Sequence, residues 1–152
     1  MAKPLHAAPC SRVGLYSAVL PLLIFAGLCL LWPAVARGQV FELQWPWISS
    51  LDLDLRFRLD GLSLLFALIV SGAGFFVTVY SVDYMPGHRG RGRFFVFLHA
   101  FMLSMLGIVL ADNLLLLFVF WEATTIFSYL LIGFDHESQA ARENARQALL
   151  IT

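Results

Sequence analysis

The sequence predicts an all-α membrane protein with about four transmembrane helices and a short extracytoplasmic β-hairpin. Its 152 residues are 60% hydrophobic with a mean hydropathy of +0.80, whereas a soluble domain is nearer half apolar. The apolar residues are gathered in four blocks, each long enough to cross a bilayer as a helix. Between the first two blocks, apolar and charged residues alternate as they do in a half-buried strand.

The composition argues against several other classes of protein. The formal net charge is zero, which gives no electrostatic reason to expect nucleic-acid binding. Cys10 and Cys29 have no metal-ligating neighbours in the sequence, and we interpret both as inert thiols. The four histidines are scattered, and glycine-rich phosphate-binding motifs are absent. The sequence therefore predicts no metal, no cofactor and no enzyme activity of its own.

Residues 1–36 are expected to form an N-terminal segment and the first transmembrane helix. The apolar run extends from Val13 to Trp32, and Pro33 is expected to stop it. Basic residues, an apolar run and then Ala34-Val35-Ala36 also fit a cleavable signal peptide. The run is long for a signal peptide and long enough to span a membrane, so we favour a retained helix.

Residues 37–60 are expected to form a polar segment outside the cytoplasm. Trp45-Pro46-Trp47 is typical of the membrane interface, where indole rings sit among headgroups. The period-two alternation that follows predicts a β-hairpin on the membrane surface. It places Leu51, Leu53, Leu55 and Phe57 between Asp52, Asp54, Arg56 and Arg58.

Residues 61–133 are expected to contain three transmembrane helices, the first two over Leu62 to Tyr80 and Phe94 to Ala111. Asp60 is expected to cap the first of them, and an ion-handling role for Asp60 is the minor alternative. His99 is expected to bond to a neighbour near the headgroups, although it could also relay protons. Both helices carry a stripe of small residues that would allow close helix packing. The stripes are Ser63, Ala67, Ser71, Gly74 and Thr78, and then Ala100, Ser104, Gly107 and Ala111.

The third of these helices, Asn113 to Gly133, carries one acid, Glu122, near its middle. An ionised carboxylate at that depth costs about 2.5 kcal/mol or more, so such a residue is a functional hypothesis by default. Thr125 and Tyr129 follow at three and seven residues, on the same helical face. Two interpretations therefore stay open. Glu122 is either a titrating site to which Thr125 and Tyr129 are weaker candidate contributors, or a protonated residue that stabilises a helix–helix contact by hydrogen bonds.

Residues 134–152 are expected to form a cytoplasmic connector and the start of a further helix. Apolar character returns just before Thr152, and the chain reads as cut short. Four spans place the basic N-terminus, the loop from Pro86 to Arg93 and the connector on one side, which the positive-inside rule makes cytoplasmic. The hairpin and the turn at Asp112-Asn113 then lie outside.

Three stretches resemble the N-terminal part of antiporter-like membrane subunits. They read FRLDGLSLLFALIVSGAGFFVTVYSVDYM, LADNLLLLFVFWEATTIFSYLLIGF and ARQALLIT. The family contains the large A subunit of Mrp-type multisubunit sodium/proton antiporters and the antiporter-like subunits of complex I. The resemblance covers about Trp45 to Thr152, and its most specific part is Phe120-Trp121-Glu122. Ala123-Thr124-Thr125 looks closer to the Mrp subunit.

The resemblance implies that Glu122 matches the family's membrane glutamate, which pairs with a lysine on a later broken helix and gates proton movement. This sequence has no lysine after Lys3, so transport by the chain alone is not expected. The implied partners are other membrane subunits, the lipid bilayer, protons and sodium ions, and the implied location is the bacterial inner membrane, multi-pass. A redox-driven pump in a complex I-like or hydrogenase assembly and a non-conducting structural piece stay open as alternatives.

Overall fold

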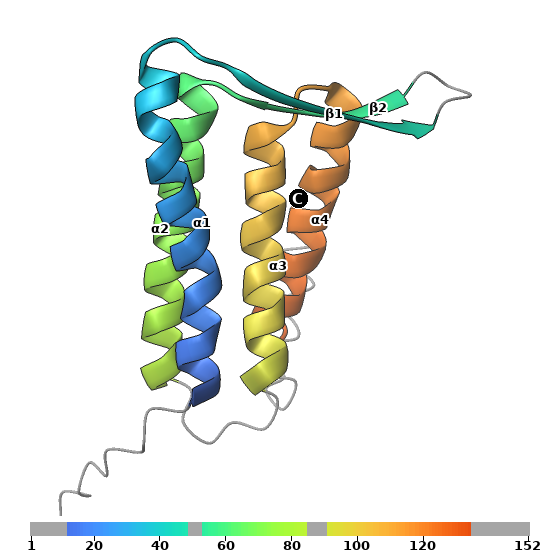
Figure 1. Ribbon diagram of the computed structural model, residues 1–152. Helices are drawn as coiled ribbons and strands as arrows, with labels where there is room; N and C mark the ends of the chain where they lie inside the picture. The colour runs from blue at the N-terminus through green and yellow to red at the C-terminus, as the bar shows by residue number, and fades with distance from the viewer. Residues whose placement is uncertain (1–11, 49–52, 85–90, 135–152) are drawn as a thin grey trace, which may run out of the picture.

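The computed structural model describes residues 12–48, 53–84 and 91–134, which form four helices and one hairpin. The order is α1 (Arg12–Ala36), β1 (Phe41–Ile48), β2 (Leu53–Leu59), α2 (Gly61–Tyr84), α3 (Arg91–Leu110) and α4 (Leu114–Ile132). Figure 1 shows α1 beside α2 and α3 beside α4, with the hairpin across one end. The predicted fold class, four apolar helices with a two-stranded antiparallel sheet, is confirmed. Leu51, Asp52, residues 85–90 and the connector 135–152 lie outside the described residues.

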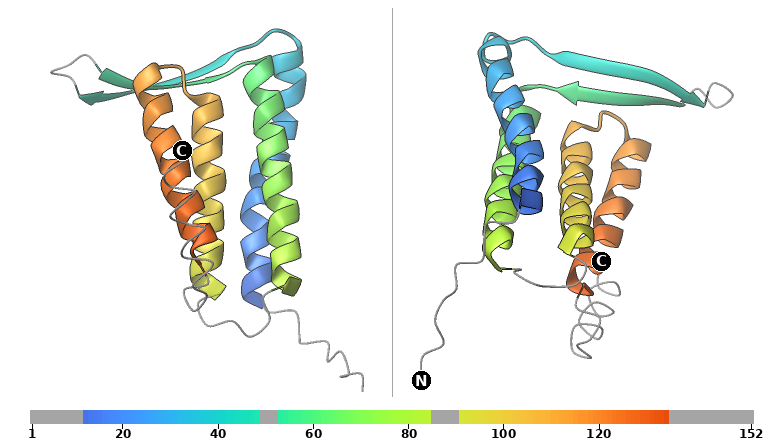
Figure 2. Two further views of the ribbon diagram at one scale, coloured as in Figure 1. Left: turned by 180° about the vertical axis from the view of Figure 1, so that it is seen from behind. Right: turned by 60° about the horizontal axis from the view of Figure 1, so that its bottom comes forward.

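All four helices are long and apolar enough to cross a membrane. Their 19 to 25 residues correspond to about 29 to 38 Å at 1.5 Å per residue, against about 30 Å of hydrocarbon. The helices run alternately up and down, so α1 and α3 end, and α2 and α4 begin, beneath the hairpin (Figure 2). This alternation is the one that the four-span prediction requires.

The expectation that Pro33 stops the first helix is wrong, because α1 contains both Pro21 and Pro33 and runs to Ala36. A proline removes one N–H from a helix, but the residues after it can still donate to carbonyls of the preceding turn. The side chain of Arg37 also donates from Nε to the Pro33 carbonyl at 3.0 Å, which satisfies one acceptor of the last turn. The chain then leaves the helix through Gly38, whose φ of 85° suits glycine.

The second and third spans are longer than their apolar runs, since α2 continues to Tyr84 and α3 begins at Arg91. The side chain of Arg91 joins the end of α2 to the start of α3. Its Nη2 donates to the carbonyl of Val82 at 2.7 Å, from the start of α3 to the last turn of α2. A long polar side chain can reach such a carbonyl while its stem packs along apolar surface.

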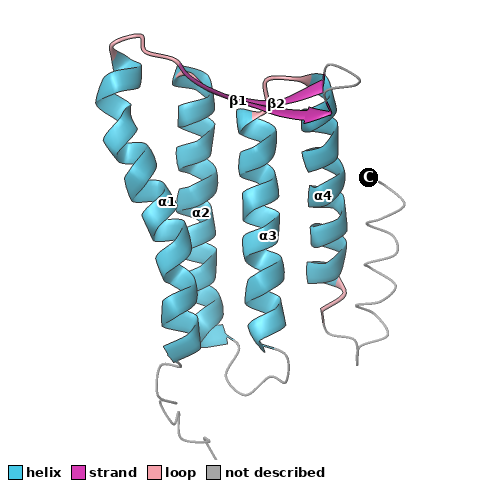
Figure 3. Cartoon of the chain, turned by 45° about the vertical axis from the view of Figure 1, so that its right-hand side comes forward, coloured by secondary structure: helices cyan, strands magenta, loops and turns pink. Residues whose placement is uncertain are grey.

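The hairpin lies across the ends of α3 and α4 (Figure 3). Its strands are antiparallel, with Phe41 opposite Leu59 and Trp45 opposite Leu55, and the register is irregular after Pro46, which cannot donate to the ladder. The predicted alternation is present in β2, where Leu55, Phe57 and Leu59 are partly buried while Arg56 and Arg58 are exposed. An isolated bridge between Phe57 and Ala111 joins this strand to the end of α3.

The stripe of small residues on α2 is largely buried in the bundle. Ser63, Ala67, Ser71 and Thr78 are all at most 9% exposed. The hydroxyls of Ser71 and Thr78 donate to the carbonyls of Ala67 and Gly74 in their own helix, at 2.7 Å each, so these two hydroxyls are paired. Gly74 lies so close to the Met102 side chain of α3 that a Cβ there would overlap its sulfur. The stripe thus allows close helix contact.

Candidate functional site

The helix that carries Glu122 begins at a well-defined cap. Asn113 has extended backbone angles, and its side-chain oxygen accepts from the N–H of Leu116 at 2.6 Å. Its side-chain nitrogen donates to the carbonyl of Asp54 in β2, also at 2.6 Å. The neighbouring N–H of Asp112 donates to the carbonyl of Arg56 at 2.9 Å. The start of α4 is therefore bonded to the hairpin.

The middle of α4 is set against α3 by one aromatic side chain. The ring of Phe120 lies directly over the backbone of Gly107, in the space where a Cβ would be. On its other side, Phe120 meets Phe57 of β2 with a centroid distance of 6.1 Å. These contacts fix the rotation of α4, and hence the direction in which residues 121 and 122 point.

Glu122 is exposed on the outer face of α4, away from the other described helices. It lines a hollow of about 660 Å³ whose other described lining residues all belong to α4: Leu114, Leu115, Leu117, Phe118 and Trp121. Its carboxylate makes no hydrogen bond or ion pair with any residue in the described ranges. Only 6% of the α4 span is buried, against 17% to 33% for the other spans. The acid thus lies on an apolar face that no other described helix covers.

Thr125 is turned toward α3 instead. It lines a second hollow of about 320 Å³ together with Thr124 and Ser128 of α4, where Phe101, Met105 and Ile108 form the α3 side. The hydroxyls of Thr124 and Ser128 donate to backbone carbonyls of α4 at 2.7 and 2.9 Å, and that of Thr125 lies 3.4 Å from the Trp121 carbonyl. Thr125 and Glu122 thus line different hollows, although residues three apart are neighbours on the helix surface.

Tyr129 is partly buried, one turn after Thr125. Among the described residues, neither Thr125 nor Tyr129 hydrogen-bonds to Glu122. The three candidate residues share one helix, but no hydrogen bond among the described residues joins them. No cluster of three or more His, Cys, Asp or Glu side chains that could hold a metal ion occurs within residues 12–48, 53–84 and 91–134.

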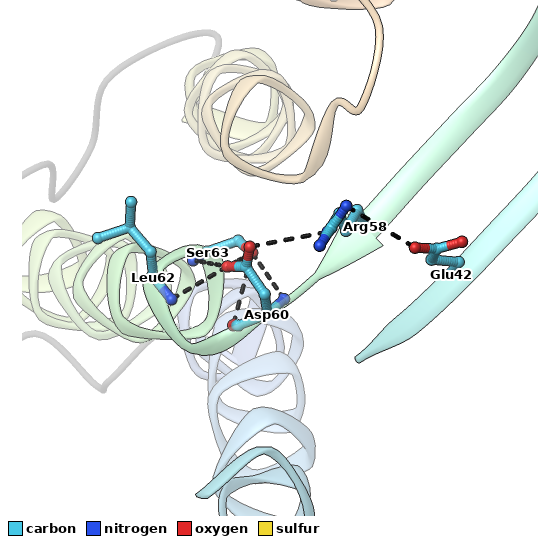
Figure 4. Close-up of polar contacts among 5 residues, drawn as sticks. All are labelled: Glu42, Arg58, Asp60, Leu62 and Ser63. Atoms are coloured by element: carbon cyan, nitrogen blue, oxygen red, sulfur yellow. Dashed lines mark hydrogen bonds and ion pairs between the residues drawn. The ribbon is translucent and has the colours of Figure 1, made fainter. Parts of the chain in front are cut away.

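Asp60 caps α2, as the sequence predicts. Its Oδ1 accepts from the N–H groups of Leu62 and Ser63 at 3.0 and 2.9 Å and from the Ser63 hydroxyl at 2.8 Å (Figure 4). Its own N–H donates to that hydroxyl at 2.9 Å. Arg58 lies 3.8 Å from both Asp60 and Glu42. Hydrogen bonds from the backbone and then the hydroxyl of Ser63 lower the pKa of Asp60, and burial opposes them only in part.

Two features of this region do not follow from the sequence patterns above. The pattern at Asp112-Asn113 predicts only a turn, although an Asn before an apolar run is also an N-cap signal that could have been used. The contact between Phe120 and Gly107 has no specific sequence signal, because Gly107 is one of several small residues at helical spacing. Both features decide how Glu122 is presented.

The sequence of this chain is similar to those of named antiporter subunits. Residues 45–95 match the model of a family described as NADH-ubiquinone oxidoreductase (complex I), chain 5 N-terminus. The chain is 42% identical over 121 residues, 79% of its length, to a putative antiporter subunit mnhA2 of Staphylococcus aureus. It is 44% identical over 135 residues, 89% of its length, to a probable A/B subunit of a K(+)/H(+) antiporter of Rhizobium meliloti. The chain covers only 15% and 13% of these relatives.

The arrangement of the helices and hairpin is also found in a solved structure. A chain of the Mrp complex from Dietzia sp. DQ12-45-1b superposes with a TM-score of 0.69 and 29% sequence identity. The match covers 89% of this chain and 18% of that chain. The matched part of the Mrp complex is therefore built in the same way as the four helices and hairpin described above.

Proposed function

The chain belongs to the antiporter-like membrane subunits that Mrp-type antiporters share with complex I, and on that premise we propose that it contributes Glu122 to proton translocation. It would act as part of a membrane subunit of a multisubunit monovalent cation/proton antiporter in a bacterial cell membrane. The observation that carries the proposal is a lone acid on a face of a membrane-length helix that no other described helix covers.

The electrostatics of that face support a titrating role. An ionised carboxylate facing hydrocarbon costs about 2.5 kcal/mol or more, and Glu122 has no partner among the described residues that would offset this cost. It is therefore stable either as the neutral acid or opposite a cationic group supplied by further helices or by another subunit. A carboxyl group that can alternate between these two situations takes up and releases a proton as the cation approaches or leaves.

The antiporter role is favoured over a redox-driven pump by the named relatives. Those at 42% and 44% identity are described as antiporter subunits, one of them for K(+)/H(+) exchange, whereas the complex I description belongs to a family model that matches residues 45–95. We therefore propose exchange of a monovalent cation for protons. Sodium is our expected cation, and potassium is the alternative to compare in the same assay.

Substitution of Glu122 in an assembled complex tests the proposal. Glu122→Gln keeps size and hydrogen-bonding capacity but removes the charge, so it should abolish cation-driven proton movement in everted vesicles while the complex still assembles. Glu122→Asp keeps the charge one methylene farther back and should retain part of the activity. Near-normal transport in the Gln variant would mean that Glu122 only holds helices together, and in that case Asp should disturb assembly more than Gln does.

Two matched variants separate Glu122 from its helix neighbours. Thr125→Val and Tyr129→Phe each remove one hydroxyl without changing the shape of α4. Because neither residue hydrogen-bonds to Glu122 among the described residues, each should reduce transport much less than Glu122→Gln. Vesicles that contain only this polypeptide should show no cation-driven pH change above empty vesicles, since the described helices offer Glu122 no cationic partner.

A further inference from the structure

A third hollow lies under the hairpin, between α1 and the end of α3. It measures about 320 Å³. The strands above it pass from the ends of α1 and α2 to those of α3 and α4 (Figure 1). The apolar lining comes from α1, from both strands and from α3, and consists of Leu28, Phe41, Leu43, Phe57, Leu59 and Leu110. The hairpin therefore forms a roof over a space that the two helices leave open.

The helices α1 and α3 meet nearer the opposite end of the bundle. There Nε2 of His99 in α3 lies 2.8 Å from the carbonyl oxygen of Ser17 in α1, so the expected bond of His99 to a neighbour is present. Toward the hairpin, Leu28 of α1 and Leu110 of α3 line the hollow instead. The space is thus specific to the end of the bundle that the hairpin covers.

The lining of the hollow requires an apolar occupant. Phe41 lies opposite Leu59, and Leu43 lies opposite Phe57, so these side chains share one face of the hairpin. The contact of Phe57 with Phe120 shows that this face is turned toward the helices. Water is retained in a hollow where it finds two to four polar partners, which apolar side chains do not offer. The apolar molecules next to the ends of membrane-length helices are the acyl chains of that leaflet.

The rim of the hollow carries one charge of each sign. Arg58 and Glu42 also line it, and Nη1 of Arg58 lies 3.8 Å from Oε1 of Glu42. The distance from Nε of Arg58 to Oδ2 of Asp60 is also 3.8 Å. Both contacts are ion pairs too long for hydrogen bonds, so the guanidinium group donates none within the described ranges. Its N–H groups suit a phosphate, and Glu42 beside it suits an ammonium group.

We propose that this hollow binds one phospholipid of the leaflet at the hairpin end. An acyl chain fills the hollow, and a zwitterionic headgroup of the phosphoethanolamine type lies at Arg58 and Glu42. Phe41 and Leu43 are 41% and 61% exposed, so the hollow opens along β1, where the lipid enters. The bound lipid joins α1, α3 and the hairpin. The site is separate from Glu122 and does not depend on the proposed transport function.

Native mass spectrometry of the full chain tests the acyl-chain site. The purified chain would be titrated with a phosphatidylethanolamine of defined acyl chains, and one molecule should bind saturably. Leu28→Trp and Leu110→Phe fill the hollow from α1 and from α3. Each should weaken binding about tenfold or more, because two buried methylene groups correspond to about tenfold in affinity.

Leu30→Trp is the matched control for these two variants. Leu30 also lies in α1, but it is 81% exposed and is not among the described residues that line the hollow. This variant should bind the lipid as the parent does. Two filling variants on different helices allow for the failure of one of them to fold. Absence of saturable binding, or equal binding by the parent and the filled variants, would overturn the proposal.

Arg58→Gln tests the contact with the headgroup. Because hydrogen bonds to charged groups are strong, the variant should bind phosphatidylethanolamine about tenfold less tightly or weaker still. Binding of a diacylglycerol with the same acyl chains and no phosphate should not change. Arg56→Gln is the control, since Arg56 is also an exposed, ion-paired residue of β2 but is not among the described lining residues. An equal loss for both lipids in Arg58→Gln would refute the headgroup assignment.

A side chain or helix of another membrane subunit is the alternative occupant, and an assembled complex distinguishes it from a lipid. The complex would be reconstituted with a phosphatidylethanolamine that carries a photoactivatable group in its acyl chain. After illumination, cross-links should map to residues that line the hollow, such as Phe41, Leu59 and Leu110. Cross-links at outer positions such as Leu30, with none in the hollow, would show that another subunit fills it and would overturn the proposal.

Discussion

The ring of Phe120 occupies the space beside Gly107 that any larger residue at that position would need. This relationship sets how closely α4 approaches α3, and through Phe57 it extends to the hairpin. Gly107→Ala should therefore push Phe120 away and destabilise the bundle by about 1–3 kcal/mol, the usual cost of overpacking. Unfolding in a denaturing detergent would measure the change.

Gly92→Ala is the matched control for Gly107→Ala. Gly92 also lies in α3, but nothing is within 4 Å of the position that its Cβ would take. Alanine is favoured over glycine in a helix, so this variant should be as stable as the parent or slightly more so. Equal stability of the two variants would show that Phe120 moves aside without cost.

Asn113 both caps α4 and bonds to the hairpin, and two variants should separate these two roles. Asn113→Asp keeps the oxygen that caps α4 but loses the donor to the Asp54 carbonyl, whereas Asn113→Ala loses both. Loss of the cap should cost about 0.5–2 kcal/mol. Amide hydrogen exchange should therefore speed up in the hairpin for both variants, and in the first turn of α4 only for Asn113→Ala. Faster exchange at α4 in the Asp variant would mean that the tie to the hairpin, and not the cap, holds this helix end.

The Asp60 cap of α2 predicts that acid lowers the stability of the folded chain. The pKa of Asp60 is lowered from its ordinary value of 3.8 by the hydrogen bonds from Ser63. A carboxyl group with a lowered pKa stabilises the folded state above its ordinary pKa, and this contribution is lost as the pH falls through the lowered value. Stability should therefore decrease on acidification below 3.8 in the parent, but less so in Asp60→Asn, whose amide oxygen still caps without titrating. Identical acid profiles in the two chains would contradict this account.

The orientation in the membrane is open to a labelling test. The basic residues at the starts of α1 and α3 predict that this end is cytoplasmic and that the hairpin is outside. Single cysteines at Leu43, which is 61% exposed in β1, and at Gly92 would be compared in a chain whose own cysteines are serine. An impermeant thiol reagent added to intact cells should label position 43 only. Labelling at position 92 alone would invert the topology, and a mature protein that begins near Arg37 would support the signal-peptide alternative.

The architecture can be predicted because the bilayer imposes length and hydropathy on each helix, and because the Leu55 to Leu59 alternation has only one regular interpretation. Pro33 is misleading because proline is read from the sequence as a local helix breaker. The sequence pattern does not show that the side chain of Arg37 donates to the Pro33 carbonyl at the end of α1. Glu122 can be found because an acid in an apolar run is conspicuous. It cannot be predicted that Thr125 lines a hollow with α3 while Glu122 does not, because this depends on the rotation that Gly107 and Phe120 impose on α4.

The bonds between the hairpin and the start of α4 also impose an order on biosynthesis. Asn113 and Asp54 are 59 residues apart in the sequence, so the ribosome completes both strands well before it reaches α4. A two-stranded hairpin by itself is marginally stable, and pairings of such long range form late. The bonds from the hairpin to Asp112 and Asn113 can therefore form only after α3 and the start of α4 have been synthesised. The helix that carries the acid is thus also the one whose arrival completes the hairpin end of the bundle.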